Sequence, residues 1–130
     1  HCKKEVELGE KDFDTLKSIY DSLPESQKQK PFENKFYTSE GCDKCNNTGY
    51  SGRLGIFEAV QVTPEVEHVV ISDLSEREIK KVTQSQGILD MAQDGLIKIM
   101  DGVTDLKEVN RVVDMERREG KMDIQSLDEL

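Results

Sequence analysis

The chain has 130 residues, which suits one domain or two small ones. Its net charge of −9 argues against nucleic acid as a partner, because proteins that bind a phosphate backbone cluster Lys and Arg. No run approaches the roughly 20 apolar residues that span a bilayer, so we expect no direct membrane insertion. Hydrophobic and charged residues each make up 35% of the chain, which is lean for a self-sufficient core.

The first third of the chain predicts one helix and one short strand. Residues 1–11 are expected to form a short extended lead. Apolar side chains recur at steps of three and four over residues 12–23, which predicts an amphipathic helix that ends at Pro24. Residues 25–35 are polar and predict a loop, and residues 35–39 predict a short strand.

Three cysteines carry the strongest chemical signal. Cys42 and Cys45 stand two residues apart, and small, glycine-rich turn residues follow them, which is typical of a metal knuckle. Cys2 resembles the second half of another Cys-x-x-Cys pair. We therefore expect Cys2, Cys42 and Cys45 to hold one structural zinc, with the fourth ligand outside this chain. Such a clip closes a loop of about forty residues and can replace a core that this segment lacks.

Other interpretations of these cysteines stay open. A thioredoxin-like redox pair would begin a helix, whereas the Asn and Gly residues after Cys45 break one. Unlinked thiols are the plainest alternative. The odd cysteine count and the absence of a secretory signal argue against a disulfide framework. His1 is adjacent to Cys2 and is poorly placed to bind the same metal.

Residues 53–62 predict the longest strand of the chain. Apolar side chains fall on both faces, which indicates a strand covered on both sides within a sheet. The chain offers too few other strands to build that sheet, so we expect its partners to lie upstream. Glu58 on this strand is expected to pair with Arg53, to lie at the sheet rim or to contact a neighbouring subunit.

Residues 63–120 predict about four helices packed as a small bundle. Thr63 should cap the first helix and Ser75 the second. The third should stop at Gly102, which suits the left-handed position that ends a helix. Thr104 is expected to cap the fourth.

The fourth helix is expected to turn one apolar stripe inward. That stripe consists of Leu106, Val109, Val112 and Val113. Arg117 and Arg118 suit the negative end of this helix, and Gly120 should close it. Residues 121–130 predict a flexible tail.

One run resembles a known family. Gly41 to Glu58, Gly-Cys-x-x-Cys-x-x-Thr-Gly-Tyr-x-Gly-Arg-x-Gly-Ile-Phe-Glu, is similar to the segment that closes the motor domain of type II secretion and type IV pilus assembly ATPases. Helical signals that follow in the same order extend the resemblance over nearly all of residues 2–118. One departure is that only Cys2 of the first cysteine pair is present.

The resemblance implies an α+β fragment of a RecA-like ATPase domain. Its parts would be a four-cysteine-type zinc subdomain over residues 1–50 and a strand joining the ATPase sheet over 51–62. A helical subdomain would follow over 63–120, with a flexible tail over 121–130. The first of these would be cut at its first ligand.

The resemblance also implies a function in a hexameric motor. The chain would help to pass changes at the subunit ATP sites to an inner-membrane platform protein, at the cytoplasmic side of that membrane. No Gly-x-x-x-x-Gly-Lys-Ser/Thr loop occurs in the sequence. ATP and magnesium are therefore expected only in the parent protein, and this chain should be inactive alone.

A second class of function stays open. The chain could be an independent zinc-ribbon adaptor that binds proteins without any ATPase attached. The coding sequence upstream discriminates the two. A cysteine three residues before Cys2, with a phosphate loop far upstream, favours the motor, and a start codon favours the adaptor.

Overall fold

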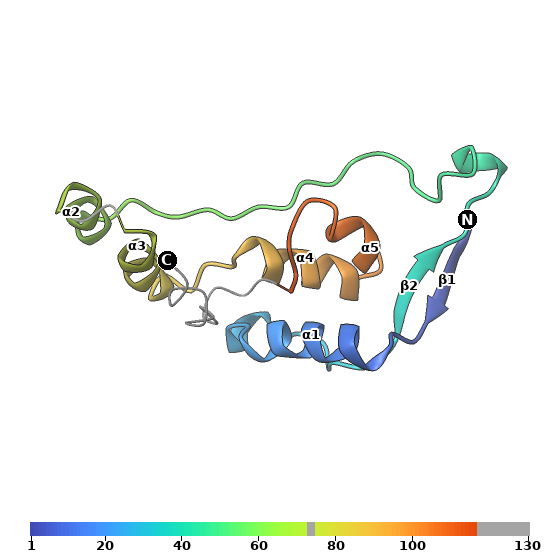
Figure 1. The fold of residues 1–130 in the computed structure, drawn as a ribbon, viewed down its shortest axis with the longest axis horizontal. Coiled ribbons are helices and arrows are strands. Elements are labelled where there is room, and N and C mark those ends of the chain that lie inside the picture. Colours follow the sequence, from blue (N-terminus) through green and yellow to red (C-terminus); the bar gives the residue numbers. More distant parts are fainter. Residues whose placement is uncertain (73–74, 117–130) are drawn as a thin grey trace, which may run out of the picture.

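The computed structural model describes residues 1–72 and 75–116, and Figure 1 shows their arrangement. The elements are β1 (Lys3–Val6), α1 (Glu10–Asp21), β2 (Phe36–Ser39), α2 (Pro64–Ser72), α3 (Glu76–Gln84), α4 (Met91–Met100) and α5 (Leu106–Val109), with 3₁₀ turns at Glu25–Gln27 and Asp43–Cys45. Arg117, Arg118, Gly120 and the expected tail lie outside the described residues. No helix in the described ranges has the length and apolar character that crossing a bilayer requires.

β1 and β2 pair antiparallel in a two-stranded sheet, with Lys3 opposite Ser39 and Val6 opposite Phe36. The expected strand over residues 35–39 is thus confirmed as β2. The extended lead was predicted without a partner, because four residues with mostly exposed side chains carry too weak an alternation to indicate pairing. The pairing places the start of the chain beside the residues that follow β2.

The core lies where α1 packs against α4, so it joins residues from distant parts of the sequence. Leu16, Ile19, Leu96 and Ile99 are at most 1% exposed. Gly95 allows the close approach of α5, because a Cβ at this position would lie 2.9 Å from the Cγ1 of Val109. The core also includes Leu23, Phe36, Val109 and Met115.

Residues 53–62 form no strand within the described part of the chain, where they have no partner, and their pairing with an upstream sheet stays a prediction. The segment runs extended along one side of the molecule, from the cysteine region to α2 (Figure 1). Leu54, Phe57 and Val62 are 57%, 71% and 73% exposed. A strand requires the backbone groups of a neighbour, and the two strands of the described residues pair only with each other. Ile56 alone packs against the core from this segment.

Side chains hold this segment where a sheet does not. The backbone N–H of Phe57 donates to Asp94 of α4 at 2.9 Å. The amide side chain of Gln86 makes two bonds to the backbone of Gln61, accepting at 3.0 Å and donating at 2.8 Å. The rest of the segment makes no hydrogen bond to other backbone among the described residues.

Glu58 contacts the beginning of α4. Its carboxylate lies 3.4 Å from the backbone nitrogen of Met91, the first residue of the helix. Arg53 forms no ion pair with it among the described residues, so the expected pair with Arg53 was wrong. An acidic group at a helix N-terminus is favourable because it faces the positive end of the helix dipole.

The four helices after the segment form two separate pairs, and the predicted single bundle was wrong. α2 packs on α3, whereas α4 packs on α1, α5 and β2. Figure 1 shows α2 and α3 at one end of the molecule, away from the sheet. α4 carries an apolar stripe that includes Leu96 and Ile99, and α1 covers it. Sequence periodicity indicates a stripe but does not identify its partner.

The expected helix ends are largely confirmed. Thr63 accepts from the N–H of Val66 at 3.4 Å, Ser75 caps α3, and Gly102 adopts φ +68 after α4. The cap of α5 was misplaced by one residue. The carboxylate of Asp105, not Thr104, accepts from the first turn.

α5 ends at Val109, so the expected longer helix and its stripe were only partly correct. Val109 is 1% exposed, but Val112 is 72% exposed and does not face inward. Backbone bonds from residues 111 and 112 to residues three positions earlier tighten the chain into turns there.

Candidate metal centre

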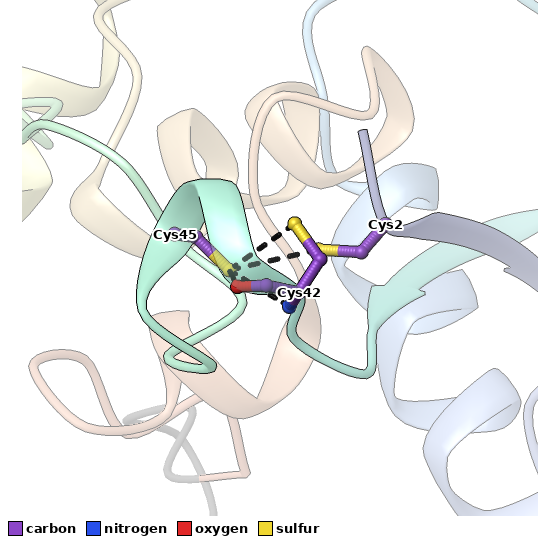
Figure 2. A group of neighbouring side chains, drawn as sticks. All are labelled: Cys2, Cys42 and Cys45. Carbon is purple, nitrogen blue, oxygen red and sulfur yellow. Dashed lines mark hydrogen bonds between the residues drawn. The ribbon is translucent and has the colours of Figure 1, made fainter.

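The three cysteine side chains converge on one point (Figure 2). The Sγ of Cys45 lies 3.7 Å from that of Cys42 and 3.9 Å from that of Cys2, and all three sulfurs lie within 4.8 Å of one another. A tetrahedral zinc with Zn–S bonds of about 2.3 Å separates its sulfur ligands by about 3.8 Å. The two shorter separations fit such an ion.

The backbone on either side of the Cys42–Cys45 turn explains why this sequence makes a knuckle. Asn46 and Asn47 adopt left-handed φ values of 52° and 59°, which Asn tolerates better than most residues. The N–H of Asn47 then donates to the carbonyl of Cys42 at 2.8 Å. Gly41 is required beside this turn, because a Cβ there would lie 2.7 Å from the Asn47 carbonyl oxygen.

Cys45 lies at the electrostatic centre of the cluster. Its Sγ accepts from the backbone N–H groups of Cys42 and Gly49, each at 3.2 Å. Burial raises the pKa of the Cys45 thiol, but these donors and the neighbouring thiols outweigh burial and lower the pKa to about 6. Thiolates are the form that binds metal, so the peptide N–H groups prepare this sulfur for a cation.

Cys2 reaches the cluster from the first residue before β1, through the pairing of β1 with β2. Burial, followed by its hydrogen bond to Cys42, raises the pKa of the Cys2 thiol. A cation would reverse this preference, because it stabilises a bound thiolate directly. Metal binding at Cys2 would therefore release a proton.

The donor set fits a soft or borderline cation. All three thiols are free, and their separations are well above the roughly 2.05 Å of a disulfide. Within the described residues three ligands converge, and His1 is not one of them. Three thiolates leave a fourth tetrahedral position for another ligand.

Two further residues near the cluster were not singled out from the sequence. The hydroxyl of Tyr50 donates to the buried carboxylate of Asp105 at 2.6 Å. No local spacing indicates this pair, because the two residues are 55 positions apart.

Comparison with known proteins identifies the class. The chain belongs to the type II/IV secretion system protein family, whose model matches residues 1–111. The match covers the cysteine cluster, the extended segment and the helices through α5.

Individual relatives agree with this assignment. The chain is 39% identical over 112 residues to the type IV pilus assembly ATPase PilB of Pseudomonas aeruginosa, covering 86% of this chain. It is 36% identical over 109 residues to PilB of Thermus thermophilus, covering 84%. It is 36% identical over 90 residues to the type II secretion system ATPase E of Vibrio cholerae, covering 69%. The chain spans only 18%, 11% and 17% of these relatives, respectively.

Proposed function

We propose that the chain is the C-terminal, non-catalytic part of an ATPase that powers type IV pilus assembly or type II secretion. The observation that carries this proposal is the family match over residues 1–111 in a chain without a phosphate-binding loop. The relatives are named as ATPases, and the chain spans less than a fifth of their length. ATP and magnesium would bind to another part of the parent protein.

We further propose that Cys2, Cys42 and Cys45 hold a structural zinc whose fourth ligand lies outside this chain. The separations of the sulfurs and the N–H donors to Cys45 support it. When bound, zinc would supply a cross-link and no redox chemistry. The three cysteines would fix the beginning of β1 against the turn after β2, and so stabilise a small sheet with little core of its own.

We also propose how the chain is divided and what it does in the full-length ATPase. We propose a zinc subdomain over residues 1–50, a connection to the ATPase sheet over 51–62 and a helical subdomain over 63–120 whose helices pack as two pairs, ahead of the tail. Within a hexamer of the parent protein, this region would couple ATP hydrolysis to a membrane platform protein. The parent would act in the cytoplasm, peripheral to the inner membrane, without nucleic acid as a partner.

The zinc site is tested by elemental analysis of the purified chain, extended upstream to include the proposed fourth ligand, and of a Cys45→Ser variant of that extended chain. We expect up to one zinc per chain in the unmutated protein and a large loss of zinc in the Cys45→Ser variant. Ser51→Ala is the matched control, because Ser51 is exposed and lies outside the cluster. Native thiols that alkylate freely, with no zinc retained, would contradict the site.

The motor assignment is tested separately. The purified chain should neither bind ATP nor hydrolyse it with magnesium. The full parent protein carrying Cys45→Ser should keep nucleotide binding but lose pilus assembly or secretion in cells, while the Ser51→Ala parent keeps both. Saturable ATP turnover by the chain alone would refute its non-catalytic role.

A further inference from the structure

One buried carboxylate joins three segments of the chain. Asp105 is 5% exposed, and its oxygens lie 2.6 Å from the Tyr50 hydroxyl and 3.4 Å from the Thr38 hydroxyl. It also accepts from the backbone N–H of Glu108 at 2.8 Å. The loop after the knuckle, strand β2 and the first turn of α5 therefore meet at this side chain.

Tyr50 stays protonated and can therefore donate a hydrogen bond to this carboxylate. Burial, and then the hydrogen bond and charge of Asp105, raise the pKa of Tyr50 to about 12. The phenol thus keeps its proton throughout the physiological range. Hydrogen bonds to a charged partner are stronger than those between neutral groups.

A short run of hydrogen bonds connects Tyr50 to the cysteine cluster. The N–H of Gly49 donates to the Sγ of Cys45 at 3.2 Å. The Thr48 hydroxyl lies 2.6 Å from the carbonyl oxygen of Cys45 and accepts from the N–H of Tyr50 at 3.4 Å. Gly49 cannot carry a side chain here, because a Cβ would lie 2.3 Å from the Oγ of Ser39. The position of Tyr50 is therefore tied to the conformation of the knuckle.

We propose that Tyr50 and Asp105 are positioning residues that join the cysteine knuckle and α5 into one cooperative unit, so that metal binding at the cysteines orders the first turn of α5. This inference rests on the proposed zinc site. A ligand that favours one knuckle conformation also favours every segment whose bonds require that conformation. The link runs from Cys45 through residues 48–50 to the buried carboxylate and then to α5.

The cavity beside this link provides a matched control. It has a volume of about 100 Å³, and Tyr37, Tyr50 and Asp105 are among the residues that line it. The ring of Tyr37 lies 4.4 Å from the ammonium nitrogen of Lys3, but its hydroxyl makes no hydrogen bond with the described residues. Tyr37→Phe and Tyr50→Phe thus each remove one phenol oxygen from the same cavity, and only the second breaks the link.

The test is amide hydrogen exchange, measured by NMR on the 130-residue chain with and without zinc. Zinc content is measured in the same samples. We expect zinc to raise the protection of the Glu108 and Val109 amides by at least roughly tenfold, because the Tyr50–Asp105 bond that transmits the effect is a hydrogen bond to a charged group. The gain should persist in Tyr37→Phe and disappear in Tyr50→Phe. The Ile99 amide of α4 should stay protected in all three proteins.

Each other outcome rejects the inference in a recognisable way. Bound zinc with an equal gain in Tyr50→Phe would refute the link and leave the metal site intact. No bound zinc in any protein would refute the metal site and the inference together. Loss of Ile99 protection in Tyr50→Phe would show that Tyr50 supports the whole fold, and would also overturn a specific link to α5.

Discussion

The knuckle at residues 41–49 and the extended segment at residues 53–62 are close in sequence but satisfy their backbone in different ways. The knuckle bonds to itself, through the carbonyl of Cys42 and the sulfur of Cys45. The extended segment depends on side chains of α4 and of the turn before it. The difference teaches that a turn built from Asn and Gly can satisfy its backbone hydrogen bonds locally, whereas a strand needs a neighbouring segment to do so.

The extended segment also differs from the core in how deeply its apolar side chains are buried. Leu96 is 0% exposed between α4 and α1, whereas Leu54 on the extended segment is 57% exposed. The two residues are chemically identical. Their substitution therefore measures what the surroundings contribute.

The largest expected effect comes from this pair of leucines. Leu96→Ala should lower the free energy of unfolding by about 2–5 kcal/mol, because it removes buried contacts and leaves a cavity. Leu54→Ala should change it by no more than about 0.5 kcal/mol, since most of this side chain stays in water. Urea unfolding followed by circular dichroism measures both. A Leu54→Ala cost close to that of Leu96→Ala would mean that the segment is packed against something in solution.

A smaller effect is expected at the beginning of α4. The Asp90 carboxylate accepts from the N–H of Gln93 at 2.7 Å, and the side-chain oxygen of Gln93 accepts from the N–H of Asp90 at 3.0 Å. Asp90→Ala should cost about 1 kcal/mol, the usual value of a helix cap. Ser75→Ala at α3 is the control and should cost less, because its bond is longer, at 3.4 Å, and α3 buries no residue. Equal losses in the same unfolding assay would contradict this ranking.

Tyr50 predicts a modest dependence of stability on pH. Its folded pKa of about 12 lies above the ordinary value of 10.0, because burial and Asp105 favour the protonated phenol, and Glu108 adds a weaker repulsion. The stabilisation is therefore complete below pH 10 and is lost as pH rises toward 12. The effect should be modest because Tyr50 is 36% exposed. The free energies of unfolding of the unmutated chain and of Tyr50→Phe should converge as pH rises through this window. A constant difference between them would reject the raised pKa.

The smallest expected effect concerns the contact that holds the extended segment. Gln86→Ala removes both bonds to the backbone of Gln61 and should change the free energy of unfolding by no more than about 0.5 kcal/mol. The Gln61 amide should nevertheless exchange faster with solvent, while the Leu96 amide should not. Exchange measured by NMR separates the two sites. An unchanged Gln61 amide would show that another group holds the segment.

Local signals in the sequence were sufficient for several features. The two-residue spacing of Cys42 and Cys45, with Asn and Gly after them, identified a knuckle, because these residues determine the backbone turn directly. Thr63, Ser75 and Gly102 identified helix ends for the same reason, since capping bonds join residues only a few positions apart. The family resemblance stated from the residues was also confirmed.

Only the tertiary structure decided how these pieces meet. The pattern of residues 53–62 predicted a strand, yet a ladder depends on backbone that the segment itself does not contain. The expected bundle would have packed the apolar stripe of α4 against the other helices of residues 63–120, but α4 packs against α1 instead. The hydrogen bond of Tyr50 with Asp105 spans 55 positions and follows no period. Local chemistry determines turns and caps, whereas packing partners are selected by the shape and burial of the whole chain, because apolar contact is non-directional.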